Sequence, residues 1–226
     1  MTAKGYRGVG MEGFVARSYD RNARVTSAEN YRAWASLLAG RIPPGSRILE
    51  VAPGPGYLAI ELAKKGYRVT GLDISRTFVE IEKQNAAEAG VEADFRLGNA
   101  SDMPLESGSF EALACTAAFK NFTEPARALR EMERVLRPGG TAWILDLKRE
   151  ASDRDIDAYL EREMKLAGWT KLWMGWTFKH FLRGRAYARS QLEGFLAQTT
   201  FAQKRISENE IGFELWLVKG GEHGNP

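Results

Sequence analysis

The sequence is poor in the side chains that bind metals or form disulfides. Its 226 residues include one cysteine, Cys115, and two histidines, His180 and His223. A single cysteine excludes an intramolecular disulfide and a cysteine-based zinc cluster, and it is typical of a reducing compartment. Two histidines leave almost nothing for a histidine-rich metal site, so we expect no bound metal.

Long hydrophobic runs and a large charge excess are also missing. No apolar run approaches the roughly 20 residues that a membrane span needs. The opening stretch, MTAKGYRGVGMEGF, has no hydrophobic signal core, so we expect a cytoplasmic location. The balance of 32 basic and 29 acidic residues gives a net charge of +3, which is too small to indicate a nucleic-acid partner by itself. A content of 44% hydrophobic and 27% charged residues is typical of a globular domain.

The order of apolar and amphipathic stretches predicts a doubly wound α/β sheet within a single domain over 1–226. Residues 1–26 are expected to form an arm or cap, 27–149 the core, 150–200 a helical cap, and 201–226 a strand hairpin. In the core, a helix after Ser27 would carry Trp34, Leu37 and Leu38 on one face, and a helix over 124–136 would end at Pro138-Gly139-Gly140. The predicted core strands are 47–51, 68–73, 94–97, 110–116 and 141–147, with further helices over 57–65 and from Ser75 to 89.

A glycine-rich turn follows the first predicted strand, in Glu50-Val51-Ala52-Pro53-Gly54-Pro55-Gly56. Gly54 and Gly56 allow positive φ and a close approach of a ligand to the backbone. Asp73 ends the second strand, where a carboxylate can accept hydrogen bonds from both ribose hydroxyls of a nucleoside. The pair predicts a nucleoside cofactor. The spacing Gly54-x-Gly56-x-x-Ala59 also matches the dinucleotide fingerprint, so NAD stays open, as does a turn that only connects two elements.

Several blocks beyond this turn share one resemblance. They read ILEVAPGPGYLAIELAKKGYRVTGLDIS, FRLGNASDMPL, FEALACTAAFKNF and ALREMERVLRPGGTAWILDL. Over about residues 30–149 the chain resembles the class I S-adenosylmethionine-dependent methyltransferases that act on small molecules. The resemblance implies S-adenosyl-L-methionine as cofactor and S-adenosyl-L-homocysteine as product. It also implies a seven-stranded Rossmann-like sheet, mostly parallel with an antiparallel last strand, plus a helical cap.

The resemblance also assigns cofactor contacts. Glu50 matches the acid near the methionine end of the cofactor, and Asp73 matches the acid that binds the ribose. Asn99 stands where the family usually has an aspartate that accepts from the adenine amino group, and its carbonyl can still accept. Ala52 replaces the first glycine, a mild change provided that its φ is negative. The full expected cofactor set is Tyr19, Glu50, Ala52, Gly54, Gly56, Asp73, Ile74, Asn99, Ala100, Thr116 and Ala117.

No general base can be assigned. Many small-molecule members of the family carry a histidine pair where this chain has Lys120 and Asn121. A charged lysine is a poor base near neutral pH, so Lys120 would be a substrate contact or a solvated loop lysine. His180, Lys120 and Tyr19 are the candidate catalytic residues, with Tyr187 as a further phenol of the same kind. In-line displacement at an activated methyl needs mainly positioning, so a base is not required for transfer.

The stretch 164–192 contains no acidic residue. Trp169, Trp173 and Trp176 recur at spacings of four and three, which places them on one face of a helix. Three interpretations stay open: a packed helix pair with a solvated basic face, a lid over the acceptor, or a basic aromatic surface for RNA or an anionic membrane. A lid would make Trp173 and Trp176 substrate contacts, in addition to the separate substrate candidate Lys120. The cations of this stretch are Lys165, Lys171, Lys179, Arg183, Arg185 and Arg189.

The sequence therefore predicts a methyltransferase that acts on a small-molecule acceptor, as a monomer or homodimer. Three alternatives remain: an RNA or protein methyltransferase, a cofactor-binding protein of this fold without methyl transfer, and an NAD-dependent oxidoreductase.

Overall fold

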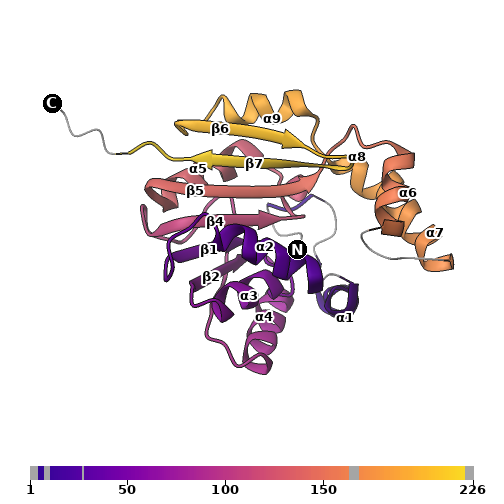
Figure 1. The fold of residues 1–226 in the computed structure, drawn as a ribbon, viewed down its shortest axis with the longest axis horizontal. Helices are drawn as coiled ribbons and strands as arrows, with labels where there is room; N and C mark the ends of the chain where they lie inside the picture. The colour runs from indigo at the N-terminus through magenta and orange to yellow at the C-terminus, as the bar shows by residue number, and fades with distance from the viewer. Residues whose placement is uncertain (1–4, 8–10, 27, 163–167, 222–226) are drawn as a thin grey trace.

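A seven-stranded mixed sheet forms the centre of the computed structural model, which describes residues 5–7, 11–26, 28–162 and 168–221 (Figure 1). The strand order is β3-β2-β1-β4-β5-β7-β6. Neighbours from β3 to β5 pair in parallel, and β7 lies antiparallel between β5 and β6, which confirms the predicted sheet. The strands are β1 Arg47–Val51, β2 Arg68–Asp73, β3 Asp94–Leu97, β4 Phe110–Thr116, β5 Leu136–Leu147, β6 Gln203–Glu208 and β7 Gly212–Val218.

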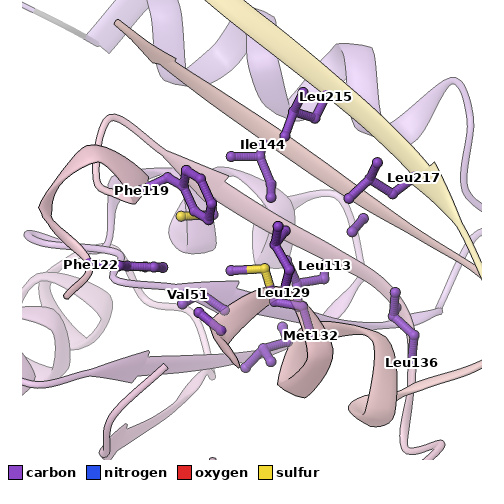
Figure 2. Close-up of a cluster of buried hydrophobic side chains, with 14 of the residues drawn as sticks. Val51, Leu113, Phe119, Phe122, Leu129, Met132, Leu136, Ile144, Leu215 and Leu217 are labelled. Carbon is purple, nitrogen blue, oxygen red and sulfur yellow. The ribbon is translucent and has the colours of Figure 1, made fainter. Parts of the chain in front are cut away.

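Helices cover both faces of the sheet (Figure 1). Successive side chains of a strand point to opposite faces, so Ile48 packs toward α2 and α3 while Leu49 packs toward α5. Figure 2 shows the α5 side, where Leu129 and Met132 of α5 meet side chains of the central strands. The helices are α1 Gly13–Thr26, α2 Ala28–Ala39, α3 Tyr57–Lys64, α4 Arg76–Glu88, η1 Phe119–Asn121, α5 Pro125–Val135, α6 Asp153–Arg162, α7 Gly168–Thr177, η2 Phe178–Leu182, α8 Arg183–Arg185 and α9 Arg189–Leu196.

The fifth strand begins earlier than the sequence predicts. Leu136 already pairs with Phe110, and the register shifts before Thr141 pairs with Ala112. Pro138-Gly139-Gly140 is therefore part of this strand and does not end the preceding helix, which stops at Val135. The irregularity needs glycine, because Gly139 has φ 73° and a Cβ on Gly140 would lie 2.9 Å from the Arg137 carbonyl oxygen.

Helix α2 buries a different face from the one predicted. Tyr31, Ala35 and Leu38 are buried at spacings of four and three, whereas Leu37 is 36% exposed. Leu37 lies on the solvent side because the helical repeat of 3.6 residues separates it from Leu38 by about 100°. Ser27, the expected first cap of this helix, lies outside the described residues.

The segment predicted as one helical cap divides into two parts. Helices α6, α7 and α8 and the π-helical turn η2 project beyond the end of the sheet and pack around Ile156 and Leu160 (Figure 1). Helix α9 instead packs with α5 against the sheet through Leu192 and Leu196. The projecting part, residues 153–162 and 168–185, is called the cap below.

Candidate active site

The glycine turn and Asp73 meet at the carboxyl ends of β1 and β2. Gly54 and Gly56 have φ of 61° and 80°, which other residues rarely adopt. The Gly54 amide donates to Asp73 Oδ2 at 3.3 Å, and the Ser75 amide donates to Oδ1 at 2.8 Å. These bonds orient the Asp73 carboxyl at the mouth of the turn, as the sequence spacing predicts.

Two carboxyl groups at this point are buried and suited to a ligand with cationic and hydroxyl groups. Asp73 is 4% exposed and Glu50 is 1% exposed. Burial raises the pKa of Asp73 to about 6 and that of Glu50 to about 8. Glu50 Oε2 has no hydrogen-bond partner among the described residues. A buried acid without a partner is costly, so the pair fits an ammonium group and a ribose diol of a nucleoside cofactor.

A third buried carboxyl group near the turn belongs to Glu82, which the sequence analysis did not identify as a site residue. It lies on α4 and is fully buried, and both its oxygens lack a hydrogen-bond partner within the described chain. Burial raises its pKa to about 10, which favours the neutral acid near neutral pH. A Cβ on Gly56 would lie 3.2 Å from Glu82 Cγ, so the glycine turn rests directly on this side chain. The sequence did contain a signal for its burial: Glu82 comes four residues after Phe78, on the inward face of a predicted helix.

Ala52 does not meet the condition under which the sequence argument called it a mild replacement for glycine. Its φ is 55°, although a negative φ was the condition for replacing glycine at this position. Ala117, at the end of β4, has φ 56°. Their amides donate to the carbonyl oxygens of Leu72 and Leu145, at 2.8 and 2.7 Å. These long-range hydrogen bonds hold both alanines in the left-handed region of φ and ψ. This backbone conformation costs an L-residue about 1–2 kcal/mol.

Helix α1 places Tyr19 over the glycine turn. Tyr19 Cε1 lies 3.9 Å from the position of a Cβ on Gly54, and the side chain is 42% exposed. The next residue, Asp20, accepts hydrogen bonds from Tyr57 at 2.6 Å and from Asn85 at 3.0 Å. Since Asn85 also donates to the Pro55 carbonyl oxygen at 2.9 Å, one network ties the arm, the turn and α4 together.

Asn99 follows β3 with its carbonyl already engaged. Its Oδ1 accepts from the Ser101 amide at 2.9 Å, whereas its Nδ2 lies 2.7 Å from the position of a Cβ on Gly5. Ile74 and Ala100, which the sequence places beside the adenine, are partly exposed. The side-chain oxygen expected to accept from adenine therefore has a competing donor.

We expect Asn99→Asp to tighten cofactor binding. A carboxylate can accept from Ser101 and from an adenine amino group at once, and hydrogen bonds to charged acceptors exceed neutral ones by about 1 kcal/mol. The dissociation constant of S-adenosylhomocysteine, measured by calorimetry, should fall about fivefold. The exposed change Asp102→Asn, three residues further along, should leave it unchanged. A weaker affinity in Asn99→Asp would show that adenine does not lie here.

Lys120 is neither a solvated loop lysine nor placed as a base. It is 5% exposed, and its Nζ lies 2.8 Å from Asp146 Oδ1 in a buried ion pair. The same Nζ donates to the Ala117 carbonyl oxygen, and the Lys120 amide donates to Asp146 Oδ2 at 2.7 Å. The pair fixes the turn after β4 that holds Thr116 and Ala117. Asp146, at the carboxyl end of β5, was not singled out by the sequence.

The other candidate bases are also poorly placed. His180 is exposed in the cap, with its ring 5.6 Å from that of Trp176. Tyr187 is fully buried, and its hydroxyl donates to the Phe122 carbonyl oxygen at 2.9 Å. His223 and Lys165 lie outside the described residues. Among the described candidates, Tyr19 alone lies at the glycine turn.

Three cations of the cap are paired with acids of α6, while the tryptophans of the cap face solvent. Asp153, Asp157 and Glu161 follow one face of α6 at spacings of four. They pair with Arg183 at 2.6 Å, Lys179 at 2.8 Å and Lys171, in that order. Trp169 is 81% exposed, and Trp173 and Trp176 are each 57% exposed. For these three cations the interpretation as a solvated basic face does not hold, because α6 supplies their partners.

Two negative findings concern the described ranges. Within them, no three His, Cys, Asp or Glu side chains are grouped so that they could hold a metal ion. No helix in the same ranges has the length and apolarity needed to cross a membrane.

Comparisons with known proteins agree with this geometry. A family model described as a methyltransferase domain matches residues 49–144. A ubiquinone/menaquinone biosynthesis C-methyltransferase of Geotalea daltonii is 32% identical over 153 residues, which are 65% of this chain and 65% of that protein. A ubiquinone biosynthesis O-methyltransferase of Xanthomonas axonopodis is 32% identical over 108 residues, 47% of this chain and 45% of that protein. The chain thus spans less than two thirds of these relatives.

Solved structures extend the similarity in fold to nearly the whole chain. A structure from Methanococcus maripaludis, named as a candidate S-adenosyl-L-methionine-dependent methyltransferase, has a TM-score of 0.76 at 20% identity and covers 97% of this chain and 98% of its own. An S-adenosylmethionine-dependent methyltransferase from Aquifex aeolicus has a TM-score of 0.63 at 16% identity, with 90% and 96% covered. The sheet order and these structures show that this chain has the fold of the S-adenosylmethionine-dependent methyltransferases, and its residues 49–144 match the methyltransferase domain.

Proposed function

We propose that this protein transfers a methyl group from S-adenosyl-L-methionine to a small-molecule acceptor. The observation that carries the proposal is the pair of buried acids at the glycine turn, Glu50 and Asp73, with an unpartnered oxygen on Glu50. An ammonium group and two ribose hydroxyls would satisfy these acids, whereas the pyrophosphate of NAD would be repelled by them. When bound, the cofactor supplies a methyl group already activated on a sulfonium, so the chain need only bind, orient and exclude water.

Each element of the site has a proposed task. Asp73 accepts from the ribose hydroxyls, and Glu50 lies at the methionine end. Gly54 and Gly56 let the backbone approach the cofactor, with Tyr19 above the turn. The adenine lies among Ile74, Asn99 and Ala100. The strained ends of β1 and β4, Ala52 and Thr116-Ala117, face the methionine part and the methyl group.

A small acceptor fits better than RNA. The relatives are named as methyltransferases of ubiquinone and menaquinone biosynthesis, which supports an aromatic acceptor methylated at oxygen or carbon. RNA binding needs cations that are free to contact phosphates. In the cap, Lys171, Lys179 and Arg183 are instead engaged with carboxylates of α6. We also expect the protein to act in the cytoplasm, as a monomer or homodimer, which light scattering of the purified chain would test.

The donor half of the proposal is tested by binding. Calorimetry should show saturable binding of S-adenosylmethionine and S-adenosylhomocysteine, whereas reduced NAD should give no heat of binding. The acceptor half requires a panel of phenolic and quinol acceptors with radiolabelled donor. Binding of reduced NAD without S-adenosylhomocysteine would contradict the proposal, and salt-sensitive RNA binding with methyl transfer to RNA would favour the main alternative.

Trp173→Ala separates acceptor from donor contacts. If the cap encloses the acceptor, turnover should fall about tenfold or more, since an aromatic contact is worth roughly 1–3 kcal/mol. The affinity for S-adenosylhomocysteine should stay within twofold, because Asp73 and Glu50 hold the donor elsewhere. Leu37→Ala removes another exposed apolar side chain, on α2, and should leave both quantities unchanged. Unchanged turnover in Trp173→Ala would exclude the lid interpretation of α7.

A further inference from the structure

A short segment from the N-terminus pairs with the turn that follows β4. This segment, Gly5–Arg7, is called the strap. Tyr6 forms an antiparallel bridge with Phe122. The Arg7 amide donates to the Asn121 carbonyl oxygen at 2.7 Å, and the Thr123 amide donates to that of Gly5 at 3.2 Å. The two backbone hydrogen bonds of this bridge thus fix the strap beside the turn that the Lys120–Asp146 ion pair holds.

The strap links the adenine end of the site to the cap end. At one end, a Cβ on Gly5 would lie 2.7 Å from Asn99 Nδ2, and the Gly5 φ of 137° also requires glycine. At the other end, the Arg7 guanidinium lies 5.0 Å from the centre of the Tyr187 ring. Burial raises the pKa of the intervening Tyr6 phenol, while Arg185 lowers it and Asp73 and Asp146 raise it. Through Arg7 and Tyr187 the strap thus contacts the residues that follow the cap.

Two guanidinium groups in this region have no anionic partner within the part of the chain that the structure describes. Arg7 stacks on Tyr187, and Arg185 lies 5.0 Å from the centre of the Phe181 ring. Among the described residues, neither side chain donates a hydrogen bond or forms an ion pair. Arg183, two residues before Arg185, shows the contrast because it pairs with Asp153 at 2.6 Å. Aromatic stacking orients a guanidinium and leaves its edge of N–H donors available.

The nearby acids are already engaged. Asp146 accepts from Lys120 Nζ, from the Lys120 amide and from the Leu147 amide. Asp73 accepts from the amides of Gly54 and Ser75 and faces the donor side. Tyr187, on which Arg7 stacks, pairs with Lys148 directly after β5, and Arg185 lies two residues before Tyr187. Arg7 and Arg185 consequently leave an excess of positive charge with unused donors where the strap meets the cap, at the carboxyl end of β5.

We propose that Arg7 and Arg185, with the Tyr6 hydroxyl, bind an oxyanion of the acceptor, so that the substrate is a small molecule that carries a phenolate or a similar ionised oxygen. This inference rests on the proposed function and names the acceptor class of the same site. A guanidinium presents paired N–H donors to an oxyanion, and such charge-assisted hydrogen bonds are about twice as strong as neutral ones.

This charge arrangement also explains how transfer proceeds without a side chain placed as a base. Cations beside an acidic hydroxyl favour its ionised form, so the proton leaves to solvent when the acceptor binds. The ionised oxygen then supplies the electron pair for the new oxygen–carbon bond, while the electrons of the breaking carbon–sulfur bond stay on sulfur. The products are an ether and a neutral sulfide, and no proton remains to be removed. Lys120 and His180 need no part in this step.

The probe that tests the proposal is 4-nitrophenol, whose ionisation is visible in its absorbance spectrum. In the presence of S-adenosylhomocysteine, the wild type should bind the phenolate and lower the pKa of the bound phenol by about one unit. Arg7→Gln and Arg185→Gln should each weaken phenolate binding about tenfold. The neutral ether 4-nitroanisole has nearly the same shape as 4-nitrophenol. It should bind to the wild type and to both variants with the same affinity. Arg154→Gln, an exposed arginine of α6, is the matched control and should leave phenolate binding within twofold.

Either of two results would overturn the proposal. One is phenolate affinity in the Arg7→Gln, Arg185→Gln double variant equal to that of the wild type. The other is absence of phenolate binding to the wild type with S-adenosylhomocysteine bound. Calorimetry on the same samples distinguishes a failure of the acceptor proposal from a failure of the proposed function. Intact S-adenosylhomocysteine binding with no phenolate preference contradicts only the acceptor class, whereas loss of S-adenosylhomocysteine binding in the wild type contradicts the proposed function.

Discussion

Replacing Lys120 by alanine should lower the free energy of unfolding by about 3–5 kcal/mol. The substitution leaves Asp146 buried without its cation, because the two side chains are 6% and 1% exposed and share an ion pair of 2.8 Å. It also removes the donor to the Ala117 carbonyl oxygen, where φ is already positive. Urea unfolding followed by far-ultraviolet circular dichroism measures the loss. The donor affinity should fall as well, because the turn after β4 loses its support.

A second ion pair of similar length provides the control. Lys64 lies 2.7 Å from Glu61, but the side chains are 46% and 21% exposed. Lys64→Ala should therefore cost less than about 0.5 kcal/mol. The double change Lys120→Met, Asp146→Asn removes both buried charges and keeps a side-chain oxygen that can accept from one of the two backbone amides that Asp146 binds, so it should recover part of the lost stability. If Lys120→Ala and Lys64→Ala lowered the free energy of unfolding equally, burial of the Lys120–Asp146 pair would contribute nothing to stability.

Asp73→Asn should weaken S-adenosylhomocysteine binding about 10- to 100-fold, which corresponds to the roughly 1.5–3 kcal/mol of a hydrogen bond to a charged group. The amide keeps the size of the side chain, but it replaces one oxygen that accepts hydrogen bonds with a donor. Calorimetry near pH 8 measures the change. Asp94→Asn, on the exposed end of β3, is the matched control and should bind like the wild type. Unchanged affinity in Asp73→Asn would contradict the placement of the ribose.

The pKa of Asp73 adds a pH dependence with a defined sign. Burial raises this pKa from 3.8 to about 6, and ribose hydroxyls donate to the ionised form. The affinity for S-adenosylhomocysteine should therefore fall as the pH drops below about 6, and Asp73→Asn should abolish that dependence. Between about pH 4 and 6 the folded protein binds the Asp73 proton and the unfolded chain does not, so this group makes the cofactor-free protein less stable as the pH rises.

Local patterns were enough to predict the sheet and the positions of the glycine turn and Asp73. The strands Arg68–Asp73, Asp94–Leu97 and Phe110–Thr116 have the predicted bounds, because short apolar runs between turn residues specify buried strands directly. The glycine turn and Asp73 were also placed correctly, since both follow from where consecutive parallel strands end. Their assignment to particular cofactor groups remains a prediction.

Only the tertiary structure determined the backbone of Ala52, the Lys120–Asp146 pair, the pairing of the cap cations and the position of the strap. Each depends on residues far apart in the chain: Lys120 and Asp146 are separated by 26 positions, and Tyr6 pairs with Phe122. Whether a lysine is solvated or buried in an ion pair depends on what packs around it, and a sequence pattern of period two or 3.6 carries no such information. The sequence by itself thus determined the sheet and the position of the glycine turn and Asp73, whereas long-range packing decided the surroundings of Lys120, the cap and the strap.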